Sequence, residues 1–106
     1  MIAEDDIERA VDFLRDNAPK IAQAKATAMH MDDYTKVVKA KVMRENATLP
    51  LGAQEREAYS DPRYVSHLET KKIADEEYEC LRWMMDAAQA KIEVWRTQSS
   101  NNRKGF

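Results

Sequence analysis

The most regular pattern in the chain is a heptad repeat of apolar and small residues towards its carboxyl end. Between residues 74 and 95 these residues recur at alternating intervals of four and three positions: Ala74, Tyr78, Leu81, Met85, Ala88, Ile92 and Trp95. This spacing lines the side chains along one side of an α-helix and is typical of helices that pack as coiled coils. It predicts a seam that packs on a second helix of this chain or of a neighbouring copy, and we expect it to hold copies together.

Local signals set the ends of this helix. Asp61 is a suitable N-cap and Pro62 suits the first helical position, so the helix is expected to begin near residue 61. After Trp95 the apolar period stops, and residues 99–106 are polar and basic. We therefore expect a helix over residues 61–98 and a frayed tail over residues 99–106.

The amino-terminal half predicts two more helices. A run of acids precedes three apolar residues that share a helical face, Ile7, Val11 and Leu14. This arrangement predicts a short helix over residues 4–15, and Pro19 predicts a break or kink near residues 16–19. The following stretch contains no glycine and no second proline until residue 46, which predicts a long helix over residues 18–46. Pro50 and Gly52 then indicate a connection, before one or two helical turns over residues 54–60.

Composition supports an all-α fold. The chain has 106 residues, of which 34% are charged, and it contains only two glycines and three prolines. A single domain of this size has a modest core, so association with other copies would stabilise it. The expected architecture is a short helix, a long basic-ended helix, a loop and a long heptad-patterned helix, assembled as a helical oligomer.

The sequence also limits where the protein acts and what it does. Its apolar runs are too short to cross a membrane, and its acidic amino terminus is unlike a secretory signal, so we expect a soluble, cytoplasmic protein. The single cysteine, Cys80, excludes a disulfide within the chain, and we expect it to be a small buried hydrophobic residue. His30 and His67 are too far apart in sequence to indicate a metal pair, and each is expected to be solvated or capped. With no catalytic motif, the sequence predicts neither an enzyme nor a cofactor.

A compact basic block stands out in this acidic chain. Residues 36–44 contain four cations and no acid, although the net charge of the chain is −2; the cations are Lys36, Lys39, Lys41 and Arg44. On a helical wheel they flank a narrow stripe formed by Val38 and Val42. Such a helix would press its valines on a neighbour and show cations on both sides. The block is either a phosphate-binding surface or a solvated helix end whose cations complement the helix dipole.

Further residues fit the first interpretation. A second basic group follows the heptad seam at Arg96, Arg103 and Lys104. Aromatic residues offer surfaces on which unpaired bases stack, namely Tyr59, Tyr64, Trp83 and Trp95. Trp95 lies on the seam and is expected in the core, so Trp83 is the better candidate of the two tryptophans.

At these residues the chain resembles the phage recombination mediator UvsY family. The segment VKAKV at 38–42 is similar to the family's basic helix segment of the form LKARL, and residues 81–96 are similar to its carboxyl-terminal helix. The likeness extends from about Tyr34 to Arg96. By this resemblance Lys39 and Lys41 correspond to DNA-contacting cations. It implies a homo-oligomer in the bacterial host cytoplasm that holds single-stranded DNA, loosens the single-strand-binding protein and loads a strand-exchange recombinase.

Two functional hypotheses therefore remain. The first is a non-catalytic recombination mediator that binds single-stranded DNA through the basic block. The alternative is a helical adaptor or assembly protein that has no nucleic-acid role and uses its heptad seam to hold partner chains.

Overall fold

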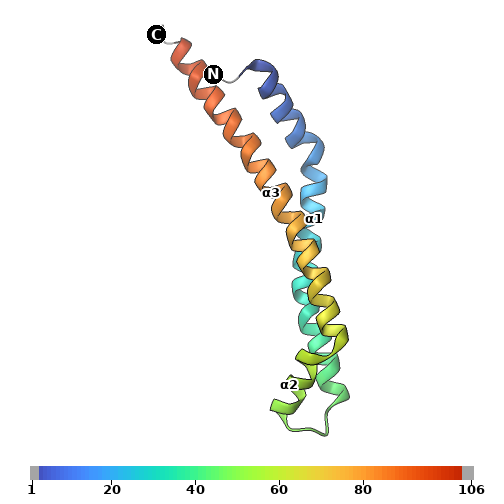
Figure 1. Cartoon of the computed structure of the whole chain (residues 1–106). Coiled ribbons are helices and arrows are strands. Elements are labelled where there is room, and N and C mark those ends of the chain that lie inside the picture. The colour runs from blue at the N-terminus through green and yellow to red at the C-terminus, as the bar shows by residue number, and fades with distance from the viewer. Residues whose placement is uncertain (1–2, 104–106) are drawn as a thin grey trace. The chain divides into compact units, whose positions relative to one another are not determined.

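The computed structural model describes residues 3–103 and consists of α-helices (Figure 1). These are α1 (Glu4–Glu45), α2 (Leu51–Ser60) and α3 (Pro62–Arg103), and no strand occurs among the described residues. The all-α prediction is confirmed. Contacts divide the chain into two compact units, which are described separately: a terminal unit formed by the residues up to Ala22 and from Glu79 onwards, and a central unit, Gln23–Tyr78.

Helix α1 runs through Pro19 without interruption, so the predicted break near residues 16–19 is wrong. The helix continues because it has a heptad seam of its own, and every residue of that seam is buried or half-buried: Ile7, Ala10, Leu14, Asn17, Ile21, Ala24, Ala28, Met31, Thr35, Val38 and Val42. Pro19 falls between seam positions and is exposed, so its ring meets solvent. Val11 lies off the seam and is 46% exposed, whereas its neighbour Ala10 is buried.

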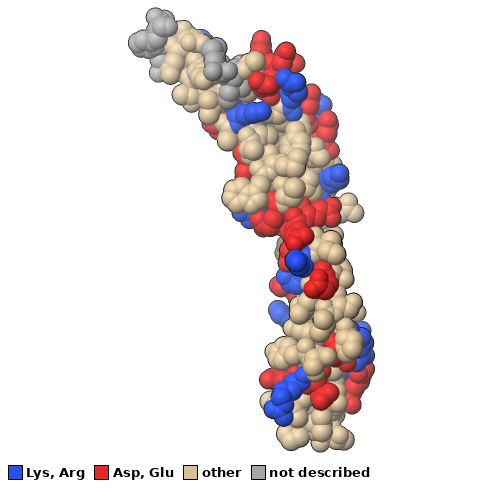
Figure 2. Space-filling model, viewed as in Figure 1, with Lys and Arg blue, Asp and Glu red and all other residues tan. Residues whose placement is uncertain are grey.

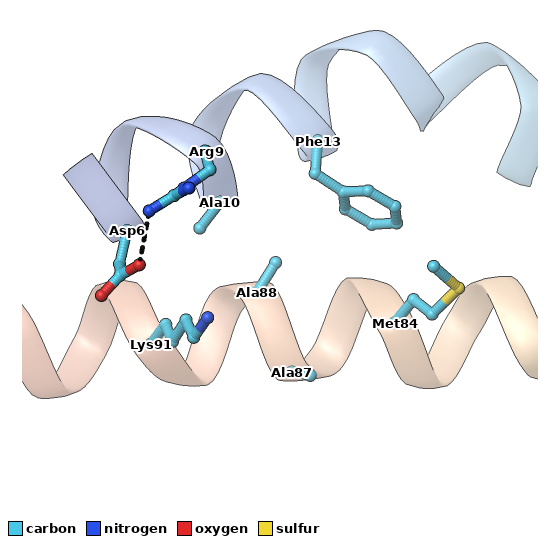
Figure 3. Close-up of a pocket in the computed structure, with 8 residues that line it drawn as sticks. All are labelled: Asp6, Arg9, Ala10, Phe13, Met84, Ala87, Ala88 and Lys91. Atoms are coloured by element: carbon cyan, nitrogen blue, oxygen red, sulfur yellow. Dashed lines mark hydrogen bonds and ion pairs between the residues drawn. The ribbon is translucent and has the colours of Figure 1, made fainter. Parts of the chain in front are cut away.

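In the terminal unit the first part of α1 packs antiparallel on the last part of α3. Ala10 and Ala88 point toward each other across an open hollow, with Phe13 and Met84 at one end of it (Figure 3). Trp95 lines a second hollow with Ile7 and Val11. The carboxyl-terminal seam therefore packs on α1 of its own chain, and a contact between copies is expected on another face.

Helix α3 is longer than predicted. It continues to Arg103, so the expected tail is helical over residues 99–103, while residues 104–106 lie outside the described part. At its start, the backbone N–H of Arg63 donates a hydrogen bond of 2.8 Å to Oδ1 of Asp61, which confirms Asp61 as an N-cap. The connection around Pro50 and Gly52 is shorter than predicted, because α2 begins at Leu51 and includes the glycine.

The central unit contains a polar contact at seam positions. His67 of α3 is buried, and its Nε2 lies 2.9 Å from both Oγ1 of Thr35 and the carbonyl oxygen of Met31 on α1. One turn away, Nζ of Lys71 lies 2.6 Å from Asp75 and 4.0 Å from Asp32. The sequence predicted that His67 would be solvated or capped. In the structure it is buried and joins the two long helices instead. We call His67 and Thr35 the polar layer.

An exposed ion network connects the end of α1 to the start of α3. The guanidinium group of Arg63 donates two hydrogen bonds to Glu45 and two to Asp61. This hydrogen bonding lowers the pKa of both carboxyl groups below their ordinary values. A lowered folded-state pKa stabilises the fold above the unfolded-state pKa, and this stabilisation is lost as pH falls through the folded-state value.

Arg63→Met is therefore expected to make stability less dependent on pH in the acid range. The change should be small because Arg63 and Glu45 are exposed to solvent and Asp61 is only half-buried. Urea denaturation of the variant and the natural chain across an acid series measures it. Arg56→Met, which removes an exposed cation of α2, should leave the pH dependence unchanged. Parallel pH profiles for Arg63→Met and the natural chain would contradict the assignment.

Candidate nucleic-acid interface

The basic block occupies the end of α1 in the central unit. Val38 and Val42 are 8% and 2% exposed, so the valine stripe faces the interior. Lys36, Lys41 and Arg44 are exposed and Lys39 is half-buried. The cations are thus on the sides of α1 that the valines leave open. Acidic and basic side chains are interspersed on the face of the molecule shown in Figure 2, so the block is a local feature rather than part of a uniformly positive surface.

Lys39 joins α1 to α2 through an aromatic ring. Its Nζ donates a hydrogen bond of 2.8 Å to the hydroxyl of Tyr59 and lies 4.8 Å from the centre of that ring. The pKa of Lys39 is raised, mainly by this hydrogen bond and with a contribution from nearby Glu55. Tyr59 is 51% exposed and packs edge-on against Tyr64 of α3, with ring centroids 5.5 Å apart. The pair therefore presents a charged ammonium group beside an accessible ring.

Lys41 makes a similar pair with a different ring. Its Nζ lies 5.7 Å from the ring centre of Tyr34, which is 37% exposed. Tyr34 in turn stacks on His30 and meets His67 edge-on. Sequence reasoning missed Tyr34 as a candidate, although it precedes Lys41 by seven residues, which is two helical turns on the same face.

The basic block thus forms two cation–aromatic pairs: Lys39–Tyr59 joins α1 to α2, and Lys41–Tyr34 lies within α1. Lys36 and Arg44 are exposed, and neither has an ion pair within residues 3–103. A cation beside an accessible ring combines the two groups that single-strand binders use, one for a phosphate and one for an unpaired base. Lys39 and Lys41 lie on opposite flanks of the valine stripe, because they are two residues apart in α1.

The second basic group belongs to the terminal unit. Arg96 is paired with Glu93 at 3.3 Å, and Arg103 is exposed in the last turn of α3. Lys104 lies outside the described residues. Each unit thus carries cations of its own, and only those of the central unit are seen beside tyrosine rings.

The two tryptophans differ in their surroundings. Trp95 is half-buried beside Ile7 and Val11, as its seam position predicted. Trp83 is 63% exposed, with the guanidinium group of Arg82 5.6 Å from its ring centre. The neighbouring turns of α3 carry Glu79 and Asp86, and these acids disfavour a phosphate chain at Trp83.

Other chemistry has little support in the described residues. Cys80 was expected to be buried but is exposed, because the buried seam runs through its neighbour Leu81 on another side of α3. Among residues 3–103, no three His, Cys, Asp or Glu side chains are grouped in a way that would hold a metal ion. None of the helices, over the same residues, has an apolar stretch sufficient to span a membrane.

Comparisons with protein-family models, with curated proteins and with solved structures found no match to this chain. The assignment of a function therefore rests on its own residues.

Proposed function

We propose that this protein is a non-catalytic mediator of DNA recombination that binds single-stranded DNA through the basic block. In this role it would hold the strand, help displace the single-strand-binding protein and load a strand-exchange recombinase. The proposal extends the resemblance of residues 38–42 and 81–96 to the UvsY family.

The observation that carries the proposal is the pairing of Lys39 with Tyr59 and of Lys41 with Tyr34. Each ammonium group can neutralise a phosphate, which releases condensed counterions and gives salt-sensitive binding. Each tyrosine has an exposed surface on which a base can stack, an interaction worth about 1–3 kcal/mol per base. Neither interaction reads a base sequence, as a protein that loads a recombinase on any strand requires.

One chain provides only a few such contacts. A homo-oligomer would repeat them, and linked weak sites gain affinity through their effective concentration. Several weak contacts also release a strand more readily than one deep pocket, which suits a mediator that passes its DNA on.

The alternative is a helical adaptor without a nucleic-acid role, favoured by the large exposed apolar side chains of the central unit. Ile73 and Leu51 are 65% and 66% exposed, and Met29 is 61% exposed. Such residues suit a protein partner better than a phosphate backbone. This alternative predicts no binding of single-stranded DNA even at low salt.

Fluorescence anisotropy of a labelled oligonucleotide across a salt series tests the proposal. The double variant Lys39→Ala/Lys41→Ala is expected to lose at least about tenfold in affinity, and the salt slope should fall by roughly one to two units. Circular dichroism should show unchanged helicity, because neither Lys39 nor Lys41 belongs to the buried core.

The matched control is Lys20→Ala/Lys25→Ala, which removes two exposed cations of α1 outside the basic block. It removes the same charge, so it separates local contacts from a general effect of net charge. Equal loss of affinity in both double variants, or none in either, would refute the assignment of Lys39 and Lys41.

A further inference from the structure

Helix α3 has a second heptad row of apolar and small residues, on the side away from its buried seam. In the terminal unit the row contains Cys80, Trp83, Ala87, Ala90 and Val94, spaced three, four, three and four residues apart. We call it the outer row. All five residues are exposed, with Trp83 at 63% and Val94 at 47%.

The outer row is not explained by packing within the chain. Helix α1 covers the inner seam of the terminal unit, where Ala88 lies opposite Ala10; of the outer row, Ala87 also lines this hollow, whereas Cys80, Trp83, Ala90 and Val94 do not. A regular apolar row in water is unfavourable, and its heptad spacing is that of a helix that packs on another helix.

We propose that the outer row binds the outer row of a second copy, with the two α3 helices parallel as a two-stranded coiled coil. In heptad terms Cys80, Ala87 and Val94 take the a positions, and Trp83 and Ala90 take the d positions. The alanines let the helices approach closely, since the distance between packed helices depends on the side chains at the contact.

The flanking charges favour a second copy as the occupant. In a parallel pair, the g position of one helix lies beside the e position of the following heptad on the other helix, and such pairs set the choice of partner and orientation. Here Asp86 at g would face Lys91 at e of a second copy. Both side chains are exposed and neither has an ion pair within residues 3–103, although Lys91 also lines the hollow between α1 and α3.

The pattern recurs in the sequence two heptads earlier, whereas the intervening pair joins Glu79 at g to the uncharged Met84 at e. Ile73 takes the a position, Lys72 the g position and Glu77 the e position, so the g and e charges are again opposite but reversed in sign. Neither Lys72 nor Glu77 has an ion pair among the described residues. The same register thus gives opposite charges in two of three consecutive g–e pairs, and the d position of the Ile73 heptad is the acid Glu76.

The charges also decide the orientation. In an antiparallel pair, g positions face g positions, which would bring the acids Glu79, Asp86 and Glu93 of the two copies together. Like charges at that distance repel, so the parallel arrangement is favoured. The same acids disfavour DNA as the occupant of the outer row.

This inference goes beyond the proposed function, because the outer row contains no cation of the basic block and its pairing requires no DNA. A dimer formed through the outer row would carry two copies of the basic block. Both tests below are made without DNA, so a failed DNA titration would leave them unaffected.

Cysteine cross-linking tests the register. A parallel pair places the two Cys80 residues directly opposite each other at an a position, where a disulfide can form. Diamide takes two electrons and two protons from the two thiols, and a covalent dimer is expected on a non-reducing gel. Cys80→Ser/Ala87→Cys moves the thiol to the next a position and should cross-link comparably.

The matched control is Cys80→Ser/Gln89→Cys, whose thiol is equally exposed but lies off the row. It should form at least about tenfold less dimer. Equal cross-linking at residues 80 and 89, or none at residue 87, would overturn the proposed register.

Sedimentation velocity tests the charge pair. Asp86→Lys should weaken the dimer about tenfold, since it places Lys beside Lys91 of the other copy, and Asp86→Lys/Lys91→Asp should restore it. A chain that stays monomeric at every concentration, or a double variant as weak as the single one, would overturn the inference.

Discussion

Val42→Asp is expected to unfold the central unit. Val42 is 2% exposed, the most deeply buried large side chain of the described residues. An unpaired carboxylate at such a site costs several kcal/mol, which is a large part of the roughly 5–15 kcal/mol that stabilises a small domain. The conservative Val42→Ala should cost about 1–3 kcal/mol, because it leaves a small cavity. Circular dichroism and urea denaturation measure both effects.

The matched control for this prediction is Val37→Asp. Val37 lies in the same part of α1 but is 42% exposed, so its carboxylate would remain in water. Its stability should stay within about 0.5 kcal/mol of the natural chain. If Val37→Asp and Val42→Asp were equally destabilising, the valine stripe would not be the inner face of α1.

Pro19→Ala is expected to stabilise the protein by about 1–3 kcal/mol. Proline within a helix removes a hydrogen bond to the carbonyl four residues earlier, here that of Arg15, and costs about 3 kcal/mol relative to alanine. Part of the gain is lost because alanine gives the unfolded chain more freedom, about 0.4–1 kcal/mol. The gain should appear as a higher midpoint in thermal and urea denaturation.

Pro62→Ala provides the comparison for this variant. Pro62 is the first residue of α3, where proline loses no helix bond, so its replacement should give no gain. A break in α1 at residues 16–19 would make Pro19→Ala equally neutral. The two variants together thus test the continuity of α1 directly.

The two long helices were not equally visible in the sequence. The seam of α3 was found because seven apolar or small residues follow one another from Ala74 to Trp95 without a polar interruption. The seam of α1 has the same spacing but includes Asn17 and Thr35, whose side chains donate hydrogen bonds to backbone carbonyls within the helix. These polar positions and Pro19 concealed a continuous helix.

The candidate site was predictable only in part. The sequence identified the basic block and its valine stripe, because both follow from local helical geometry. It did not predict that Lys39 meets Tyr59, since these residues are 20 positions apart and join only when α2 packs near α1. The outer row was also missed. Its exposure, which distinguishes it from the neighbouring seam, follows only from the structure.

The polar layer has a consequence for how the hairpin of the central unit is aligned. A heptad pattern looks the same after a slip of seven residues, and a seam rich in alanine offers little resistance to sliding. Such a slip would set Ala28 or Val42 against His67 in place of Thr35. The imidazole would then lose its hydroxyl partner and keep only a backbone carbonyl, at a cost of about 0.5–1.5 kcal/mol for one lost hydrogen bond. One histidine thereby selects a single alignment out of several near-equivalent ones and keeps Lys39 in reach of its tyrosine.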